Sequence, residues 1–356
     1  MNWGDFIVKI DTKKIQVESG ETWKQFTLTN DNGVTAEFLD YGGIITKILV
    51  PDNKGNIENV VLGYENLEDY KTNPFYLGAL IGRVAGRIKG ATFHLNGNTY
   101  SVESNDGENC LHGGSVGFNH VLWETTSFQT EDKIGVHLIY RSMDGEGGFP
   151  GNVDIEVTYT LTNYNQFIID YYAKSDKTTP LTLTNHSYFN LSGNLKHTVH
   201  QQHVVLDSRK FVELDEALIP TGKLVNVEGT SFDFRNGRRL GEGFNEHTKQ
   251  NSIANEGYDH YFLFDNALEN NIVMKDIDSG RILSVRTNQP GVVMYTSTTL
   301  PEGLRLAEGL SERYLGVCFE TQSSPASLHE EDFPSVILEP GEPYEKQTVF
   351  SFDIED

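Results

Sequence analysis

Short segments in which apolar and polar residues alternate recur along most of this chain, and they constrain its fold more than any other feature. Examples run over residues 134–140, 153–161 and 167–173, and each is followed by a stretch containing Gly, Asn or Asp. A period of two places successive side chains on opposite faces of a strand, so that one face is buried. The pattern therefore predicts antiparallel strands rather than amphipathic helices.

Two strand pairs are predicted with their turns. Residues 93–95 and 100–102 flank Asn96-Gly97-Asn98, and further strands are expected on either side of Asp278-Ser279-Gly280. Gly, Asn and Asp tolerate the positive φ angles that tight hairpin turns require.

Helices have a minor place in this sequence. Helical windows are limited to short pieces at 66–70 and 213–218, and no Pro- or Ser-rich linker, repeat or low-complexity tract divides the 356 residues. The 34 Gly residues suit many turns, while 20 Phe and 16 Tyr provide apolar material for a large core. We predict one large all-β domain with few short helices.

The charge balance excludes several classes of partner. With 51 acidic and 28 basic residues the formal net charge is −23, and no basic run gathers Lys and Arg. Such a surface repels nucleic acid and acidic membranes. The longest apolar runs have four residues, as at 261–264, too few to span a bilayer, and the N-terminus lacks the order of a signal peptide. With only Cys110 and Cys318, both expected to be packed free thiols, we predict a cytoplasmic protein.

Two of the eleven His residues stand in unusual contexts. His112 precedes Gly113-Gly114, which lets a backbone or ligand approach the ring closely. His186 lies in LTLTNHSYFNL, where Thr182, Thr184 and His186 are expected on one strand face. From the pattern alone, each ring is either functional or a buried His bonded to its neighbours.

A carboxylate stands in the apolar segment 313–324. Alternation predicts that Leu315, Val317 and Phe319 face the core, and that Gly316, Cys318, Glu320 and Gln322 face the other side. If that side is buried, the pKa of Glu320 rises toward that of a working base. If it faces solvent, Glu320 is an ordinary surface charge.

Arg and Asp side chains also appear in apolar company. Arg83 and Arg87 stand four residues apart in IGRVAGRI, where each guanidinium needs hydrogen-bond acceptors. These acceptors are either those of a ligand or those of an internal ion pair with a carboxylate. Asp259 lies between aromatic residues in GYDHYF. Aromatic faces with a carboxylate and Arg donors are typical of sugar sites, whereas a buried structural Asp is the competing interpretation.

Metal and phosphate chemistry have weaker support. His197, His200 and His203 have a spacing that does not converge three rings on one face, so we predict a surface cluster and no metal site. No Walker-type loop, G-x-S-x-G or HExxH occurs. We therefore expect neither a metal nor a cofactor.

The order of the motifs IGRVAGRI, NCLHGG, LTNHSYFNL, YDHYF, NQPGVVMYTS and FETQSSPAS resembles the aldose 1-epimerases. The resemblance runs from about Phe26 to Phe350 and implies a large antiparallel β-sandwich, the galactose-mutarotase-like supersandwich, with an open cleft. On this basis we expect a single catalytic domain over residues 26–356. Residues 1–25 would then form an extension, either an added strand or a packed arm.

The same resemblance assigns roles to individual residues. It makes His186 the acid and Glu320 the base, and it places Arg87, His112, Asp259 and Gln289 at positions that hold the sugar. Arg87 is preferred to Arg83 because the second Arg of the motif is the sugar contact in the family. Some members have Asn before that Arg, where this chain has Gly86, so one side-chain contact differs.

The implied reaction interconverts the α and β anomers of a free aldose, with D-galactose and D-glucose as candidates. It requires a proton to leave the C1 hydroxyl and another to reach the ring oxygen, so we expect Glu320 to be ionised and His186 protonated. The implied partner is a neutral monosaccharide, and the protein is expected to be a monomer or homodimer.

Three alternatives remain open from the sequence. The first is a sugar-binding or sensing protein without activity, and the second is a glycoside-cleaving enzyme with Asp259 and Glu320 as its carboxylate pair. The third is a hexose-phosphate epimerase, which the net charge of −23 disfavours.

Overall fold

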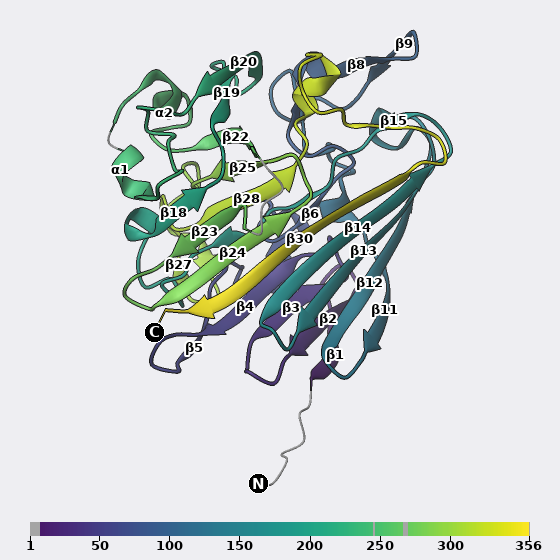
Figure 1. The fold of residues 1–356 in the computed structure, drawn as a ribbon. Helices are drawn as coiled ribbons and strands as arrows, with labels where there is room; N and C mark the ends of the chain where they lie inside the picture. Colours follow the sequence, from purple (N-terminus) through teal and green to yellow (C-terminus); the bar gives the residue numbers. More distant parts are fainter. Residues whose placement is uncertain (1–7, 245, 266–269, 356) are drawn as a thin grey trace.

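Three antiparallel sheets build most of the fold in a computed structural model that describes residues 8–244, 246–265 and 270–355 (Figure 1). The largest sheet has nine strands, in the spatial order β11 (Glu124–Gln129), β12 (Lys133–Ser142), β13 (Val153–Thr162), β14 (Gln166–Ser175), β30 (Pro343–Ile354), β24 (Arg281–Thr287), β23 (Ile272–Lys275), β18 (His203–Leu206) and β21 (Arg238–Arg239).

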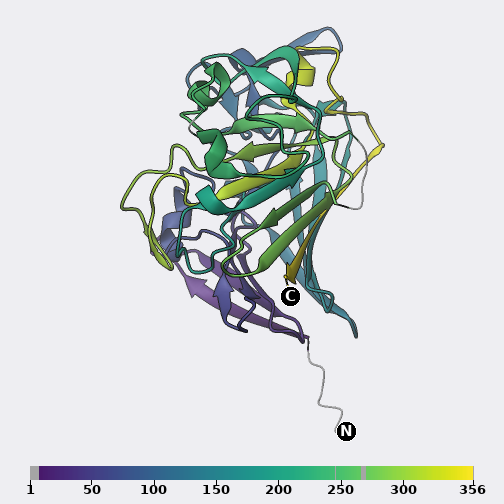
Figure 2. The ribbon, with the colours of Figure 1, turned by 60° about the vertical axis from the view of Figure 1, so that its left-hand side comes forward.

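Two smaller sheets form the second layer. One has the order β1 (Lys9–Gln16), β2 (Thr22–Thr29), β3 (Thr35–Leu39), β4 (Ile45–Pro51) and β5 (Ile57–Asn59). The other has the order β17 (Tyr188–Phe189), β28 (Val317–Gln322), β25 (Gly291–Tyr295), β22 (Asp259–Leu263), β19 (Lys210–Leu214) and β20 (Pro220–Asn226). Figure 2 shows the two smaller sheets one above the other beside the long strands of the largest.

Short strand pairs and helices complete the architecture. The pairs are β6 (Leu80–Ile81) with β16 (Thr184–Asn185), β7 (Arg87–Ile88) with β10 (Cys110–Leu111), β8 (Thr92–Leu95) with β9 (Asn98–Ser101), β15 (Thr179–Pro180) with β29 (Ile337–Leu338), and β26 (Arg305–Leu306) with β27 (Gly309–Leu310). The α-helices of the described residues are α1 (Leu240–Phe244) and α2 (Lys249–Ile253), and short 3-10 turns cover 67–71, 89–91, 118–120, 146–148, 199–201 and 325–328. None of the described helices is long and apolar enough to cross a membrane.

The main core lies between the two layers. Alternate residues of the nine-stranded sheet, such as Val136, Tyr159 and Ile169, belong to one buried cluster with Phe38 of β3 and Phe319 of β28. The prediction of an all-β antiparallel sandwich is confirmed, because the period-two pattern supplies each strand with one apolar face.

Most of the predicted local elements are present. β8 and β9 pair with Leu95 opposite Asn98, and β23 and β24 pair around residues 278–280. The helical window at 66–70 corresponds to the 3-10 turn Leu67–Lys71, which the Asn66 side chain caps.

The predicted helical piece at 213–218 is wrong. Leu214 ends β19 and pairs with Pro220 of β20, and the Asp215 side chain accepts hydrogen bonds from the N–H groups of Ala217 and Ile219. Strand pairing and this Asp-centred turn satisfy the backbone, so no helix forms.

Residues before 26 join the five-stranded sheet where they are described. All eight residues of β1 pair with β2, and the Trp23 side chain is fully buried. The expected boundary between residues 25 and 26 lies within β2.

Candidate active site

An open cavity of about 1010 Å³, counting its mouth, lies on one face of the six-stranded sheet. Its walls come from segments far apart in the sequence, including residues 74–76, 86–87, 111–112, 254–255 and 324–325. Glu320, His186, Arg87, His112 and Asp259 all line it. The cavity thus gathers most of the residues that the sequence singled out.

Strand register explains how distant residues reach one face. Glu320 of β28 lies opposite Val293 of β25, which in turn lies opposite Tyr261 of β22. Residues opposite each other in neighbouring strands point to the same side of a sheet. The adjacent row is Cys318, Tyr295 and Asp259, so the register places Asp259 two strands away from β28 and level with Cys318.

Glu320 is buried, which resolves the two interpretations that the sequence left open. Val317 and Phe319 pack in the main core, while Glu320, on the opposite face of β28, lines the cavity with 3% of its surface exposed. The surface-charge interpretation is therefore wrong, because the cavity walls and not bulk solvent cover that face.

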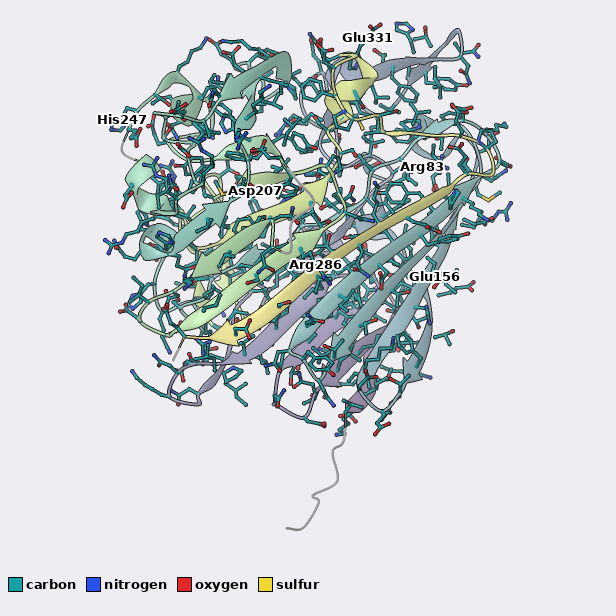
Figure 3. The ribbon with its side chains drawn as sticks, in the orientation of Figure 1. Arg83, Glu156, Asp207, His247, Arg286 and Glu331 are labelled. Atoms are coloured by element: carbon teal, nitrogen blue, oxygen red, sulfur yellow. The ribbon has the colours of Figure 1, made fainter. Side chains whose placement is uncertain are left out.

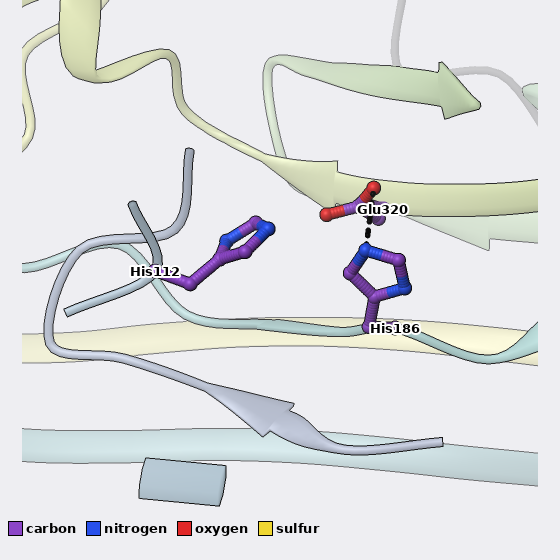
Figure 4. A group of neighbouring side chains, drawn as sticks. All are labelled: His112, His186 and Glu320. Carbon is purple, nitrogen blue, oxygen red and sulfur yellow. Dashed lines mark ion pairs between the residues drawn. The ribbon is translucent and has the colours of Figure 1, made fainter. Parts of the chain in front are cut away.

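His186 lies beside this carboxylate. Its Nε2 is 3.5 Å from Oε1 of Glu320, and the dashed line in Figure 4 marks this ion pair. The predicted single strand through Thr182, Thr184 and His186 is wrong, because the chain leaves its partner β6 after residue 185 and pairs with β28 from residue 188. His186 stands at this change of partner, where its N–H donates to the carbonyl of Ala79.

His112 is held by its own backbone and by Gly86. Its N–H donates to the Gly86 carbonyl, and the Gly86 N–H donates to its Nδ1, each at 3.1 Å. Because Nδ1 accepts a hydrogen bond, the proton of the neutral ring is on Nε2. Figure 4 shows the ring directed toward His186 and Glu320, so His112 presents a hydrogen-bond donor to the cavity.

Potential ligand atoms of His112, His186 and Glu320 lie within 4.8 Å of one another, which raises the question of a metal ion. The hydrogen bond from Gly86 already uses the one lone pair of the neutral His112 ring. Ligation through Nε2 would require a tautomer that loses this bond. The donor set therefore does not suit a metal ion, and His197, His200 and His203 form no such group in the described parts of the chain.

The two Arg residues have different surroundings. Arg87 donates from Nε to Asp106 at 2.7 Å and lies 3.8 Å from the Asp259 carboxylate, at the cavity wall. Arg83 is 3% exposed and donates to Ser142 Oγ and to the carbonyl oxygens of Pro150 and Met143; Figure 3 marks its place. Arg83 therefore ties loops together through neutral acceptors.

The structure does not place Gln289 at the cavity, where the resemblance assigned it to sugar binding. It is buried but does not line the cavity, and its Nε2 donates to the Leu183 carbonyl and to Tyr344 Oη. It precedes β25 by two residues, and its side chain links this turn to the segments that carry Leu183 and Tyr344. Sugar binding is not assigned to it further.

Sequence reasoning noted the aromatic residues around Asp259 but assigned no individual aromatic side chain to the cavity. Tyr76, Tyr188, Tyr261 and Tyr295 line it, and the Tyr76 ring stacks on His186 with centroids 5.8 Å apart. Three of them stand inside the motifs TNHSYFNL, YDHYF and NQPGVVMYTS, so that position was a usable signal. Apolar ring faces beside polar groups suit a molecule with both CH groups and hydroxyls.

Several cavity residues have backbone angles that are unusual for residues with a side chain. Tyr76 (φ 55°), His112 (φ 55°), Leu218 (φ 59°) and Asn255 (φ 53°) all lie in the left-handed region. Such strain persists where the surrounding structure holds it, and it often accumulates at functional sites.

Burial sets the protonation of the central pair. Burial lowers the pKa of His186 to about 4, and burial followed by repulsion from Asp259 raises the pKa of Glu320 well above its usual value, although Arg87 opposes this. The expected starting form, with a charged His186 and an ionised Glu320, is therefore not the one that this environment favours. A proton shared by the pair therefore lies on Glu320 rather than on His186.

The pattern of the family described as aldose 1-epimerase matches residues 24–351. The chain belongs to the aldose 1-epimerase family. Galactose mutarotase of Bos taurus is 38% identical over 94% of this chain and 95% of its own length, and the Homo sapiens protein is 37% identical over the same shares.

Other members of the aldose 1-epimerase family are also similar. Maltose epimerase of Levilactobacillus brevis is 32% identical over 92% of this chain and 94% of its own. The crystal structure of galactose 1-epimerase from Lactobacillus acidophilus superposes with a TM-score of 0.88 at 28% identity, covering 98% of this chain and 100% of that one. This chain therefore shares its fold with that structure and aligns with these relatives over nearly their whole length.

Proposed function

We propose that this aldose 1-epimerase acts on free aldoses, with D-galactose as the first candidate substrate. The observation that carries the proposal is the buried pair of His186 and Glu320, 3.5 Å apart in an open cavity. An acid and a base side by side are what ring opening requires. The names of the relatives in mammals favour galactose over other aldoses.

The proposed reaction moves protons without changing their number on the pair. Glu320 takes the proton of the C1 hydroxyl, His186 gives one to the ring oxygen, and the C1–O5 bond breaks to give the open-chain aldehyde. Rotation about C1–C2 then presents the other carbonyl face, and the reverse transfers close the ring. Ring opening starts from ionised Glu320 and protonated His186. Transfer of one proton from Glu320 to His186, across the 3.5 Å contact, produces this form from the favoured one.

Neighbouring groups hold the sugar in this proposal. Arg87 and Asp259 bind hydroxyls, the His112 Nε2–H donates to an oxygen, and tyrosine rings cover the CH faces. Each positioned acid or base contributes about 10²–10⁴-fold, so the pair lowers the barrier by about 5–11 kcal/mol. A neutral sugar needs no electrostatic steering, which agrees with the net charge of −23.

Reducing disaccharides are a second candidate substrate class. The cavity is open at its mouth, so a second sugar unit attached away from C1 can extend toward solvent. One relative is named maltose epimerase. The glycoside-cleaving alternative is weaker, because the two carboxylates it needs have other partners. Asp259 lies beside Arg87, and Glu320 lies beside the His186 ring.

Polarimetry tests the proposal directly. Freshly dissolved α-D-galactose should reach its equilibrium rotation many times faster with the protein than in buffer alone. Glucose, xylose and maltose in the same assay would rank the substrates. If the protein binds galactose by calorimetry without accelerating equilibration, the non-catalytic alternative is correct.

The two Arg residues should respond differently to substitution. Arg87→Met is expected to raise KM about tenfold or more, because it removes the donor at the cavity wall that faces Asp259. Arg83→Met leaves three acceptors without a donor and should lower that free energy by about 3 kcal/mol. Urea unfolding and substrate titration separate the two effects, and equal KM values in both variants would contradict the assignment.

A further inference from the structure

We infer that Gln322 is a further sugar-binding residue, whose side-chain oxygen accepts a hydrogen bond from a hydroxyl remote from C1. This inference rests on the proposed function. Gln322 follows Glu320 by two residues on β28, on the same strand face, and both residues line the cavity.

The orientation of the Gln322 amide follows from its neighbours. Its nitrogen is 3.2 Å from the carbonyl oxygen of Ala85 and 3.4 Å from that of Ser323. Carbonyl oxygens only accept hydrogen bonds, so the NH₂ group must face them. The side-chain oxygen Oε1 then points to the other side of the amide.

That oxygen has no hydrogen-bond partner among the described residues, although Gln322 is only 1% exposed. A buried acceptor without a donor destabilises a fold, and native structures contain few of them. An orphaned oxygen in a residue of the cavity wall is accounted for if a ligand hydroxyl supplies the missing donor.

The spacing along β28 indicates which part of the sugar Gln322 meets. Residues two apart on a strand are separated by roughly 7 Å, which is about the span of a pyranose from one side to the other. With Glu320 at the C1 hydroxyl, Gln322 Oε1 is placed at a hydroxyl on the far side of the ring.

Gly86 makes room for this amide. A β-carbon at position 86 would lie 3.3 Å from Gln322 Nε2 and 3.0 Å from Pro325 Cγ. Both contacts are tight, so a larger residue there would press on the amide that Ala85 and Ser323 hold. Gly86 and Gln322 therefore form one wall of the cavity together.

Replacing Gln322 by Met removes the acceptor and keeps the length of the side chain. Gln322→Met is expected to raise KM for galactose about tenfold while kcat changes less than about threefold, because the lost bond is present in both bound sugar and transition state. The matched control is Gln25→Met, on β2 and away from the cavity, which should retain wild-type constants.

A panel of monodeoxy galactoses identifies the hydroxyl. In the wild type, the deoxy sugar that lacks the contacted hydroxyl should also show a KM about tenfold higher, and Gln322→Met should add nothing further for that sugar. Two changes that remove the same contact have non-additive effects on binding free energy, whereas changes to independent contacts add. Full additivity for every deoxy sugar, or an unchanged KM in Gln322→Met, overturns the inference.

Two further results keep the test decisive. If Gln322→Met does not fold, a crystal structure of the wild type with galactose replaces it, and Oε1 should then lie about 2.7–3.0 Å from a ring hydroxyl. An oxygen outside hydrogen-bond distance of the sugar overturns the inference. A wild type that binds aldoses without interconverting their anomers would instead contradict the proposed function.

Discussion

Glu320→Gln is expected to lower kcat for anomer interconversion by about 10²–10⁴-fold with little change in KM. The amide keeps the size of the side chain and its hydrogen bonds to a bound sugar, but it cannot accept the proton of the C1 hydroxyl. Polarimetry at saturating sugar measures the loss. Glu156→Gln is the matched control, because Glu156 is a half-exposed carboxylate on β13 (Figure 3).

Retention of the full rate in Glu320→Gln would contradict the proposed mechanism. A large rise in KM with unchanged kcat would instead make Glu320 a binding residue. Loss of activity in the Glu156→Gln control would show that the assay reports general damage to the fold rather than a lost base.

The same variant should be more stable than the wild type at neutral pH. Burial raises the pKa of Glu320 in the folded state, so the folded protein resists losing this proton. Below about pH 4.5 the group is protonated whether the chain is folded or not, and the difference should vanish. As pH rises toward the folded-state pKa the wild type loses stability and the amide does not. Urea midpoints at several pH values measure this.

His186→Gln is the second variant with a large expected effect, also about 10²–10⁴-fold in kcat. Gln cannot give a proton to the ring oxygen, so ring opening would depend on water for that step. His247→Gln is the control, because His247 is exposed and bonded to Glu256 outside the cavity (Figure 3). An active His186→Gln variant would show that another group supplies the proton.

The pH dependence of the wild type should follow from the proton count of the pair. Burial lowers the pKa of His186 to about 4, so below that pH the pair takes a second proton and kcat/KM should fall. Above the raised pKa of Glu320 the pair loses its only proton, and kcat/KM should fall again. A plateau between the two is expected. The acidic fall should be absent from the residual activity of His186→Gln.

Stability should respond to His186 in the opposite direction from Glu320. The pKa of His186 is lower in the folded state than in the unfolded chain, so unfolding takes up a proton as pH falls from 6.5 toward 4. The wild type should lose stability over that range, and His186→Gln should lose less. Equal slopes in both proteins would contradict the burial that lowers this pKa.

Much of the fold was predictable because it depends on local patterns. Alternation in 134–140, 153–161 and 167–173 corresponds to β12, β13 and β14, since a strand with one buried face needs apolar residues at every second position. The turn at Asn96-Gly97 was predictable for the same local reason. Residues 213–218 were not, because the pairing of Leu214 with Pro220 is a contact that a local window does not contain.

The candidate site was predictable in part, through motifs. Glu320, His186, Arg87, His112 and Asp259 line one cavity, as the resemblance implied. Gln289 does not line it, although its motif lies close to site residues in the sequence. The turn before β25 directs its amide to Leu183 and Tyr344 instead.

The sequence by itself determined which strands have a buried face and which family the motifs belong to. Only the tertiary structure decided which carboxylates are buried and which ring nitrogen carries a proton. The reason is physical: a pKa or a hydrogen-bond partner depends on what surrounds a group in three dimensions. For Glu320, His186 and Gln322 those surroundings come from strands and loops far apart along the chain.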